Sequence, residues 1–217
     1  MTNLQKRILT SIIILPLSIF FIIKGGYYLL FFLLSVFLIA NYELFSVFNK
    51  KITILFLDLA LILSLFSIYF LRDNSEISFQ LLLWLIILCI CSDIGGYVFG
   101  KTFKWKKFTS VSPKKTLSGA IGSFIFSIFS LIIVANINFA SFTFTINFLE
   151  PKFFFLSIIF SLIAQIGDLT ISYFKRIEKI KDTGKVLPGH GGIFDRIDSL
   201  MFVIILAYFL YQFKIIP

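Results

Sequence analysis

The chain has 217 residues, of which 59% are hydrophobic and 14% are charged, and its formal net charge is +9. Soluble domains carry about 25% charged residues, so this composition excludes an ordinary soluble protein and indicates a single polytopic membrane domain. The Lys and Arg residues cluster beside apolar runs, so topology and anionic lipid or phosphate ligands explain them, and no nucleic-acid partner is expected. Cys89 and Cys91 lie two apart in an apolar run, so neither a disulfide nor a zinc site is expected.

Seven apolar runs follow one another, which predicts an all-α polytopic integral membrane bundle of about seven transmembrane helices. Lys6 and Arg7 precede the first run, which lacks a small-x-small cleavage site and is expected to be an uncleaved span. We expect N-terminal helices over residues 1–78 and a catalytic core with two cytoplasmic polar loops over residues 79–217. The expected spans are residues 8–23, 27–48, 52–71, 79–99, 117–137, 153–174 and 199–216.

The distribution of Lys and Arg predicts the orientation of these spans. If the N-terminus is cytoplasmic, sixteen of these cations lie on the inner side and four lie on the outer side. The positive-inside rule therefore places the N-terminus and both long polar loops in the cytoplasm and the C-terminus outside. The two loops can then share one active site on the cytoplasmic face of the cell inner membrane.

The loop after the fourth run carries the first polar residues that indicate chemistry. Asp93 lies near the cytoplasmic end of that run, and ionisable groups at membrane depth are costly and usually functional. Lys114 and Lys115 follow Ser112 and Pro113 just before the fifth run, where they can contact phosphate near a helix N-terminus. Anchoring of the helix explains these two lysines equally well. For the lysines at positions 101, 104, 106 and 107 we favour the anchoring role.

The second group of polar residues begins inside the sixth run. Asp168, Ser172 and Lys175 stand at i, i+4 and i+7 and share one helical face. Asp168 lies about 9 Å below the end of the run, at 1.5 Å per residue. An unpaired carboxylate there would cost several kcal/mol, whereas a divalent metal ion would keep it charged. The alternative is a structural ion pair of Asp168 with Lys175 or Arg176.

The segment that follows leads into the seventh run. Asp195, Asp198 and Ser199 stand at i, i+3 and i+4 at the start of that run. The turn at residues 188–192 holds the single histidine, His190, among glycines that permit close approach to a ligand. Carboxylates beside fixed cations and a glycine-rich turn indicate a metal-bound polyphosphate site at a membrane surface.

Residues 172–198 fill every fixed position of a long pattern. The pattern runs Ser172-x-Phe174-Lys175-Arg176, then Lys181-Asp182-x-Gly184, then Leu187-Pro188-x-His190-Gly191-Gly192-Ile193-x-Asp195-Arg196-Ile197-Asp198. It resembles the signature of the phosphatidate cytidylyltransferase (CDP-diacylglycerol synthase) family. Further matches, at Gly167-Asp168-Leu169, at Ser92-Asp93 with Tyr97 and Gly100, and at residues 112–116 with Gly119, extend the resemblance over residues 92–200.

The resemblance implies that CTP and phosphatidate react to give CDP-diacylglycerol and diphosphate, in phospholipid biosynthesis. It also implies Mg²⁺, with room for a second cation, a membrane lipid environment and a homodimer. The implied metal ligands are Asp168 and Asp195. The implied catalytic residues are Asp168, Lys175, Asp195 and Arg196, and the implied substrate-binding residues are Asp93, Ser112, Lys114, Lys115, Ser172, Arg176, Lys181, Asp182, His190, Gly191, Gly192 and Asp198.

Two positions depart from the family pattern, and two other interpretations compete with it. Ile171 and Ser118 stand where the family commonly has acidic residues, but neither departure affects the carboxylates assigned to metal. Another membrane nucleotidyl- or phosphotransferase could act on a different lipid phosphate or lipid alcohol. A cation-coupled transporter would also carry intramembrane carboxylates, but no paired halves with broken helices are visible.

Overall fold

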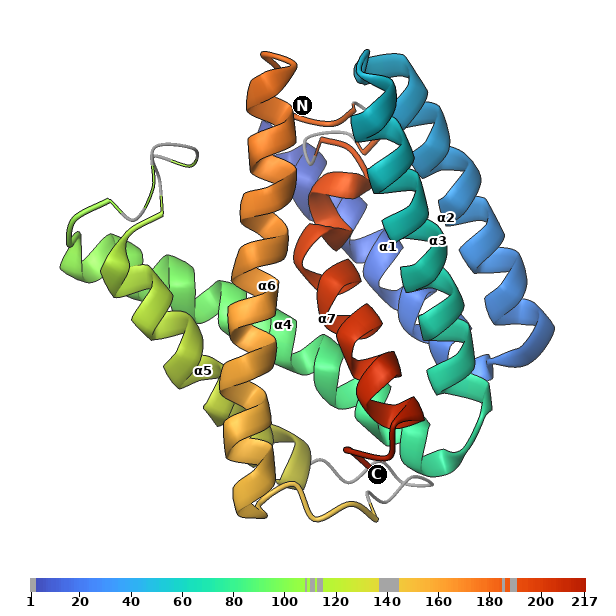
Figure 1. Cartoon of the computed structure of the whole chain (residues 1–217), viewed down its shortest axis with the longest axis vertical. Coiled ribbons are helices and arrows are strands. Elements are labelled where there is room, and N and C mark those ends of the chain that lie inside the picture. The colour runs from blue at the N-terminus through green and yellow to red at the C-terminus, as the bar shows by residue number, and fades with distance from the viewer. Residues whose placement is uncertain are drawn as a thin grey trace.

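The computed structural model describes residues 3–107, 109, 112, 115–136, 145–184, 186, 187 and 191–217, with side chains at residue 10 and from residue 12 onward. Apart from two isolated β-bridges, the regular elements in these ranges are α-helices, which confirms the predicted all-α fold (Figure 1). The helices are α1 (Asn3–Lys24), α2 (Gly26–Val47), α3 (Lys51–Asp73), α4 (Glu76–Phe103), α5 (Leu117–Asn136), α6 (Pro151–Ile177) and α7 (Phe194–Gln212).

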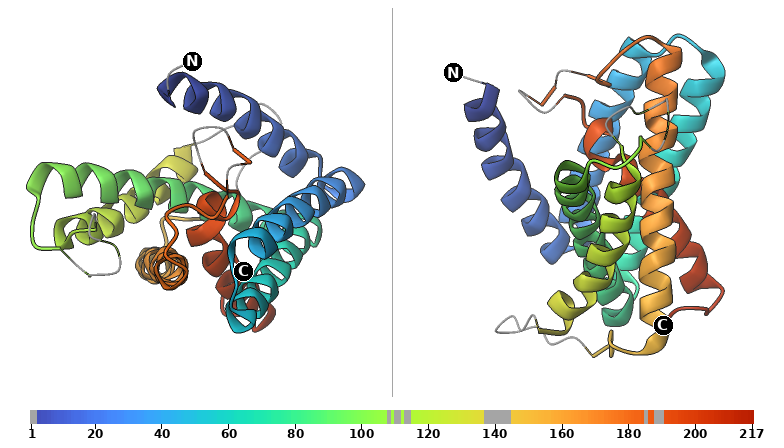
Figure 2. Two further views of the ribbon diagram at one scale, coloured as in Figure 1. Left: turned by 90° about the horizontal axis from the view of Figure 1, so that it is seen from above. Right: turned by 90° about the vertical axis from the view of Figure 1, so that its left-hand side faces the viewer.

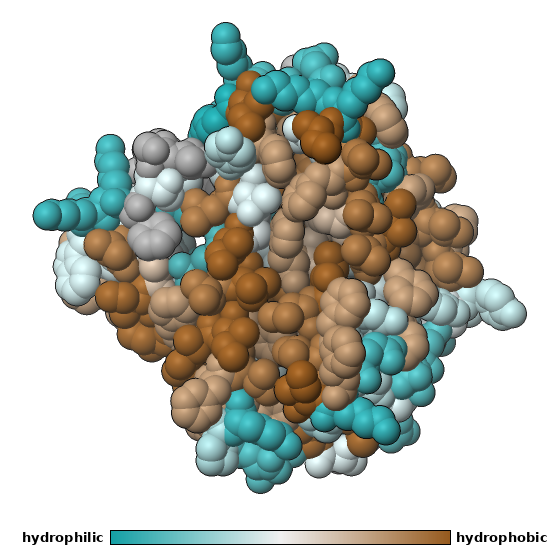
Figure 3. Space-filling model, in the orientation of Figure 1, coloured by the Kyte–Doolittle hydropathy of each residue, from teal (hydrophilic) through white to brown (hydrophobic). Residues whose placement is uncertain are grey.

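The helices have the length and composition of membrane spans. Among the described residues, α2 to α6 are each long and apolar enough to cross a bilayer. Helices α1 and α7 are not among these five. The apolar stretch of α1, Ile12–Lys24, is shorter, and α7 carries Asp195, Arg196 and Asp198 near its start. Hydrophobic side chains cover the middle of the face in Figure 3, with hydrophilic residues at its top and bottom. The chain is therefore a multi-pass membrane helical bundle, as predicted.

The bundle places the two termini at opposite ends. Helices α2, α3, α7 and α6 pack side by side, α4 crosses behind them, and α5 packs back along α4 (Figure 1). Helix α1 leans away from the others at its N-terminal end (Figure 2). The segment between α6 and α7 lies at the same end as the N-terminus and the α2–α3 turn, and the C-terminus lies at the other end.

Two apolar clusters hold the bundle together. One surrounds Trp84, whose ring lies 5.4 to 5.6 Å from those of Phe148, Phe153 and Phe160, and it joins α4, α5, α6 and α7. The other joins α2 and α3 to the end of α6 and the start of α7. Helix α3 contributes side chains to both clusters, so it packs against helices on either side of residue 78. The division of the chain at residue 78 stays a prediction.

Helices α4 and α5 approach each other closely at glycines. A Cβ atom on Gly95 would collide with the carbonyl oxygen of Gly122, and a Cβ on Gly122 would lie 2.5 Å from the carbonyl oxygen of Gly95. Beside this contact, Ser123 Oγ donates a hydrogen bond of 2.8 Å to the carbonyl oxygen of Ser92. Small residues let membrane helices pack backbone to backbone, and here they bring the start of α5 against the second half of α4.

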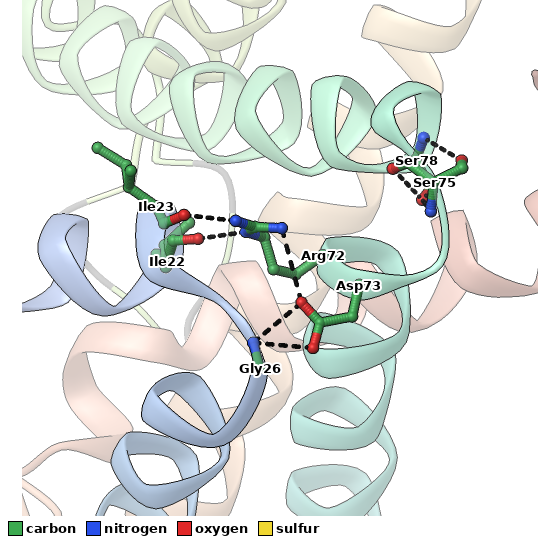
Figure 4. A network of polar contacts seen from close by, with 7 residues as sticks. All are labelled: Ile22, Ile23, Gly26, Arg72, Asp73, Ser75 and Ser78. Carbon is green, nitrogen blue, oxygen red and sulfur yellow. Dashed lines mark hydrogen bonds and ion pairs between the residues drawn. The ribbon is translucent and has the colours of Figure 1, made fainter.

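The end opposite the α6–α7 segment is fixed by a polar network (Figure 4). Both carboxylate oxygens of Asp73 accept the backbone N–H of Gly26, at 3.1 and 2.9 Å, and Arg72 donates to the carbonyl oxygens of Ile22 and Ile23. These bonds satisfy the open backbone groups where α1 ends and α2 begins. The reciprocal Ser75–Ser78 hydrogen bonds then cap the N-terminus of α4.

The helices differ from most of the predicted spans by a few residues at their ends, and two of these differences affect the site. Helix α4 continues to Phe103 instead of ending at residue 99, and α7 begins at Phe194 instead of residue 199. An apolar run marks only the part of a helix embedded in hydrocarbon, whereas the backbone hydrogen bonds continue through polar residues. Asp195 and Asp198 therefore lie within α7, and their side chains are fixed by that helix.

Candidate active site

A cavity of about 310 Å³ lies between α4, the start of α5 and α6. It brings together four residues that the sequence analysis assigned to one site: Asp93, Ser112, Lys115 and Asp168. Its other polar lining residues are Ser92, Tyr97, Thr116, Ser123 and Gln165. The first polar loop and the sixth span, separated by about fifty residues in sequence, therefore face the same space.

The strongest contact in this cavity joins the two segments directly. Lys115 Nζ lies 2.7 Å from Asp168 Oδ2 and also donates to the carbonyl oxygen of Gln165 at 3.4 Å. Ser172 Oγ donates to the other oxygen of Asp168 at 3.4 Å, so the predicted helical face is present. The suggested pairing of Asp168 with Lys175 is wrong, because Asp168 pairs with Lys115 and Lys175 pairs with Asp195, while the pairing with Arg176 stays a prediction.

Charged groups from three helices interact around the cavity. Asp93 on α4 is repelled by Asp168 on α6 and attracted by Lys115 and Arg196. Asp198 on α7 is repelled by both of these aspartates and attracted by Lys175. Like charges at close range favour a cation or a cationic side chain between them. The charged cluster consists of Asp93, Lys115, Asp168, Lys175, Arg196 and Asp198.

Asp195 organises the segment that precedes α7. Its Oδ1 lies 2.7 Å from Lys175 Nζ, and the two side chains are 8% and 14% exposed. Its Oδ2 accepts the backbone N–H groups of Thr183 at 2.8 Å and Gly192 at 3.1 Å. Gly191 has φ of +89°, and a Cβ there would lie 2.9 Å from Asp195 Oδ2, so this position requires glycine.

The glycine-rich turn is closed by its own backbone. Leu187 and Gly191 exchange two hydrogen bonds, with N–O distances of 3.0 and 3.1 Å. Four charged residues between the end of α6 and the start of α7 are exposed: Arg176, Lys181, Asp182 and Arg196. Their predicted substrate contacts stay predictions, as do those of Lys114 and His190, which lie outside the described residues.

Comparison of the sequence with known proteins identifies the family of the chain. The model of the Cytidylyltransferase family matches residues 48–214. The chain belongs to this family. The match covers α3 to α7, and with them every candidate site residue named above.

Relatives within the cytidylyltransferase family carry a specific name. The phosphatidate cytidylyltransferase of Rickettsia conorii is 32% identical over 219 residues, covering 95% of this chain and 90% of that protein. The phosphatidate cytidylyltransferases of Helicobacter pylori strain 26695 and Staphylococcus haemolyticus are 37% and 38% identical, over 64% and 63% of this chain. The chain spans about half the length of these last two, 48% and 50%. The predicted family and enzyme class, a nucleotidyltransferase, are confirmed.

The donor atoms of the cytidylyltransferase site fit the Mg²⁺ that the family implies. Mg²⁺ prefers oxygen ligands and is usually held by one or two carboxylates together with substrate phosphates. Asp168 lines the cavity with 35% of its side chain exposed, so it can meet a metal–nucleotide complex. In the described ranges no three acidic, His or Cys side chains already surround one ion position. The joint assignment of Asp168 and Asp195 stays a prediction, since both oxygens of Asp195 already bind protein groups.

One residue of the site region had no predicted role. Glu43, near the end of α2, is 1% exposed, and its Oε2 accepts the backbone N–H of Ile193 at 2.7 Å. The sequence marks Glu43 only as an acidic residue in an apolar run. Its partner is a backbone group 150 residues away, which the residue types of the sequence do not indicate. The two departures from the family pattern are both buried: Ile171 packs in the second apolar cluster, and Ser118 hydrogen-bonds Thr116 Oγ1 at 3.0 Å.

Proposed function

We propose that the chain is a phosphatidate cytidylyltransferase, which transfers the cytidylyl group of CTP to phosphatidate and releases diphosphate. One observation carries the proposal: Lys115 of the first polar loop contacts Asp168 of α6 at 2.7 Å, in a cavity that Asp93 also lines. The match to the Rickettsia conorii enzyme over 95% of this chain supports the choice of substrates. The proposal includes a place in the cell inner membrane, a cytoplasmic active site and a homodimer.

The reaction requires neutralised phosphates more than it requires a base. A phosphate oxygen of phosphatidate bonds to the α-phosphorus of CTP as the bond to the leaving diphosphate breaks. Phosphatidate is already ionised at neutral pH, so no side chain has to remove a proton, and His190 needs no acid–base role. Mg²⁺, when bound, neutralises the triphosphate and the leaving diphosphate.

The residues of the charged cluster have complementary tasks in this reaction. Lys115 and Arg196 attract Asp93 electrostatically, and both could hold phosphate oxygens by charge-assisted hydrogen bonds. Asp168 would hold the metal ion through its carboxylate, and Lys115 could then exchange this carboxylate for a phosphate oxygen. Lys175, held by Asp195, has a fixed position toward Asp198. Fixed positions matter because phosphoryl transfer gains mainly from orientation and charge stabilisation.

An assay of purified protein in detergent tests the proposed function. CTP labelled at the α-phosphate and phosphatidate should give labelled CDP-diacylglycerol, and the label should stay in CTP when diacylglycerol replaces phosphatidate. A product formed from diacylglycerol or a polyprenol by transfer of the γ-phosphate would instead assign the chain to a lipid kinase activity. The same assay with UTP or ATP in place of CTP measures the choice of base.

The proposed orientation predicts which loop a membrane-impermeant thiol reagent can reach. Sixteen Lys and Arg residues on the inner side against four on the outer favour a cytoplasmic position for Lys104, an exposed residue just after α4. In a variant without Cys89 and Cys91, cysteine at position 104 should label only after the cells are opened. Cysteine at Lys152, at the start of α6, should label in intact cells. Labelling of position 104 in intact cells would refute the orientation.

Lys115→Met should weaken the use of CTP without affecting membrane insertion. The variant loses a charge-assisted contact to phosphate, worth about 1.5 to 3 kcal/mol, so kcat/KM for CTP should fall about 10- to 100-fold. Lys106→Met, in the same loop, is the matched control because Lys106 is exposed and was assigned an anchoring role. Equal kcat/KM values for the two variants would show that Lys115 only anchors the start of α5.

A further inference from the structure

Glu43 lies outside the residues matched by the family model, yet it contacts the site segment directly. It stands on α2, one turn before the helix ends, and its side chain is 1% exposed. Its Oε2 accepts the backbone N–H of Ile193 at 2.7 Å. Its Oε1 is buried and has no hydrogen-bond partner among the described residues. A buried carboxylate needs such backbone donors to remain charged.

The position of Glu43 explains how α7 begins. Ile193 is the N-cap residue of α7 and supplies no side-chain acceptor, so the first N–H groups of the helix need one from elsewhere. Glu43 provides it: besides Ile193, the backbone N–H groups of Phe194 and Val186 interact with its carboxylate. A negative charge at a helix N-terminus is stabilised by the helix dipole. Glu43 therefore caps α7 and also holds the segment before the glycine-rich turn.

Two glycines of the same segment make room for the Glu43 side chain. A Cβ on Gly184 would collide with Oε1 of Glu43 and lie 2.5 Å from its Cδ. A Cβ on Gly192 would lie 2.6 Å from Oε2 of Glu43. Gly184 and Gly192 therefore contact the carboxylate from both sides of the turn. Any side chain at either position would displace the Glu43 carboxyl group or the backbone of this segment.

The same segment is bonded to Asp195 from its other side. Thr183 N–H and Gly192 N–H both donate to Asp195 Oδ2, next to the residues that touch Glu43. Thr183, Gly184, Gly192 and Ile193 thus lie between two carboxylates, one from α2 and one from α7. Burying the carboxylate of Glu43 costs desolvation free energy, which an apolar side chain of the same volume would not. The carboxylate contributes hydrogen bonds that an apolar side chain cannot make, and these bonds fix the backbone of the segment.

We propose that Glu43 is a positioning residue, which holds Gly184, Gly192 and Ile193 where Gly191, Gly192 and Lys175 can meet the phosphates of CTP. This inference rests on the proposed function for its substrate. Glu43 does not line the cavity at Asp168 and acts through the turn. It also gives α2, which precedes the family match, a part in catalysis.

Kinetics of Glu43→Gln test the inference on activity. Gln keeps the size of Glu and can keep an acceptor oxygen at Ile193, but it removes the negative charge at the start of α7 and weakens this hydrogen bond, so the turn should loosen. KM for CTP should rise about 10- to 100-fold, while KM for phosphatidate should stay within about twofold. Glu178→Gln is the matched control, because Glu178 also accepts a backbone N–H, that of Lys50 at 3.1 Å, but has no described contact with residues 183–193. A fall in kcat with both KM values unchanged would overturn the inference.

A spectroscopic measurement separates this inference from the proposed function. In protein without Cys89 and Cys91, a spin label on Val186→Cys should become more mobile when Glu43→Gln is added. A label on Phe213→Cys, an exposed position at the other end of α7, should not change. If the parent protein transfers no cytidylyl group, the proposed function fails, but the spectra still decide whether Glu43 orders the turn. Equal mobility at position 186 with and without Glu43 would overturn the inference.

A compensating pair of substitutions keeps the test valid if Glu43→Gln fails to insert. Gly184→Ala places a methyl group against the Glu43 carboxyl and should raise KM for CTP. Glu43→Asp shortens the side chain and should relieve that collision, so the double variant should use CTP better than Gly184→Ala alone. Additive losses in the double variant would show that the two positions act independently and would overturn the contact on which the inference depends.

Discussion

Asp168→Asn is expected to lower turnover by about two to three orders of magnitude while the protein still inserts into the membrane. Asparagine keeps the size of the side chain but removes the charge that a Mg²⁺–nucleotide complex needs. It also leaves Lys115 without its partner at 2.7 Å, in a cavity whose other carboxylate is Asp93. Asp168 is 35% exposed, so the loss should appear in catalysis and not in folding.

Turnover should be measured at saturating Mg²⁺ and divided by the amount of inserted protein. Asp58→Asn is the matched control, since Asp58 is an intramembrane aspartate on α3 that does not line the cavity. The control should keep nearly the activity of the parent protein. Near-normal turnover of Asp168→Asn under these conditions would remove Asp168 from the metal site, whatever the family pattern implies.

The sequence predicted the helices well because their signal is local. Each apolar run reports its own burial in hydrocarbon, and no distant contact is needed to recognise it. The errors fall where that signal ends: α4 extends through Gly100 to Phe103, and α7 includes Asp195 before its apolar part begins. In both places the helix continues through polar residues, so the hydrophobicity of the sequence does not mark where it ends.

The site was predictable in its membership and less so in its pairing. Asp93, Lys115 and Asp168 were assigned to one site, and they do line one cavity. Helical spacing put Lys175 on the face of Asp168, yet Lys175 pairs with Asp195 of the next helix and Lys115 takes its place. Pairing depends on how α5 and α7 pack against α6, and the residue types along the sequence do not specify that packing.

Glu43 shows the limit of motif reasoning most clearly. Its partners are the backbone N–H groups of Ile193, Phe194 and Val186, and backbone groups leave no mark on the residue types of the sequence. The family pattern begins later in the chain, so the resemblance offered no role for it either. Only the folded chain shows that the end of α2 and the start of α7 meet.

Asp195→Asn should also lower turnover by orders of magnitude, but through a different balance of effects. Asp195 is 8% exposed and binds Lys175 with one oxygen and two backbone N–H groups with the other. Asparagine has one acceptor oxygen, so it must give up either the lysine or the turn. Removing one partner of a buried ion pair costs about 3 to 5 kcal/mol, so the melting temperature in detergent should fall as well.

A companion substitution separates the structural role of Asp195 from its predicted role at the metal. Lys175→Met added to Asp195→Asn removes the uncompensated charge and should restore much of the lost thermal stability. If Asp195 also binds the metal ion, turnover of the Lys175→Met, Asp195→Asn double variant should stay low. Adding Asp168→Asn to Asp195→Asn should then lower turnover little further, because both carboxylates would hold the same metal ion. Recovery of turnover together with stability would limit Asp195 to holding Lys175 and the turn. Asp168 would then bind the metal with Asp93, which lines the same cavity, or with Asp198 of α7, which also interacts with it electrostatically.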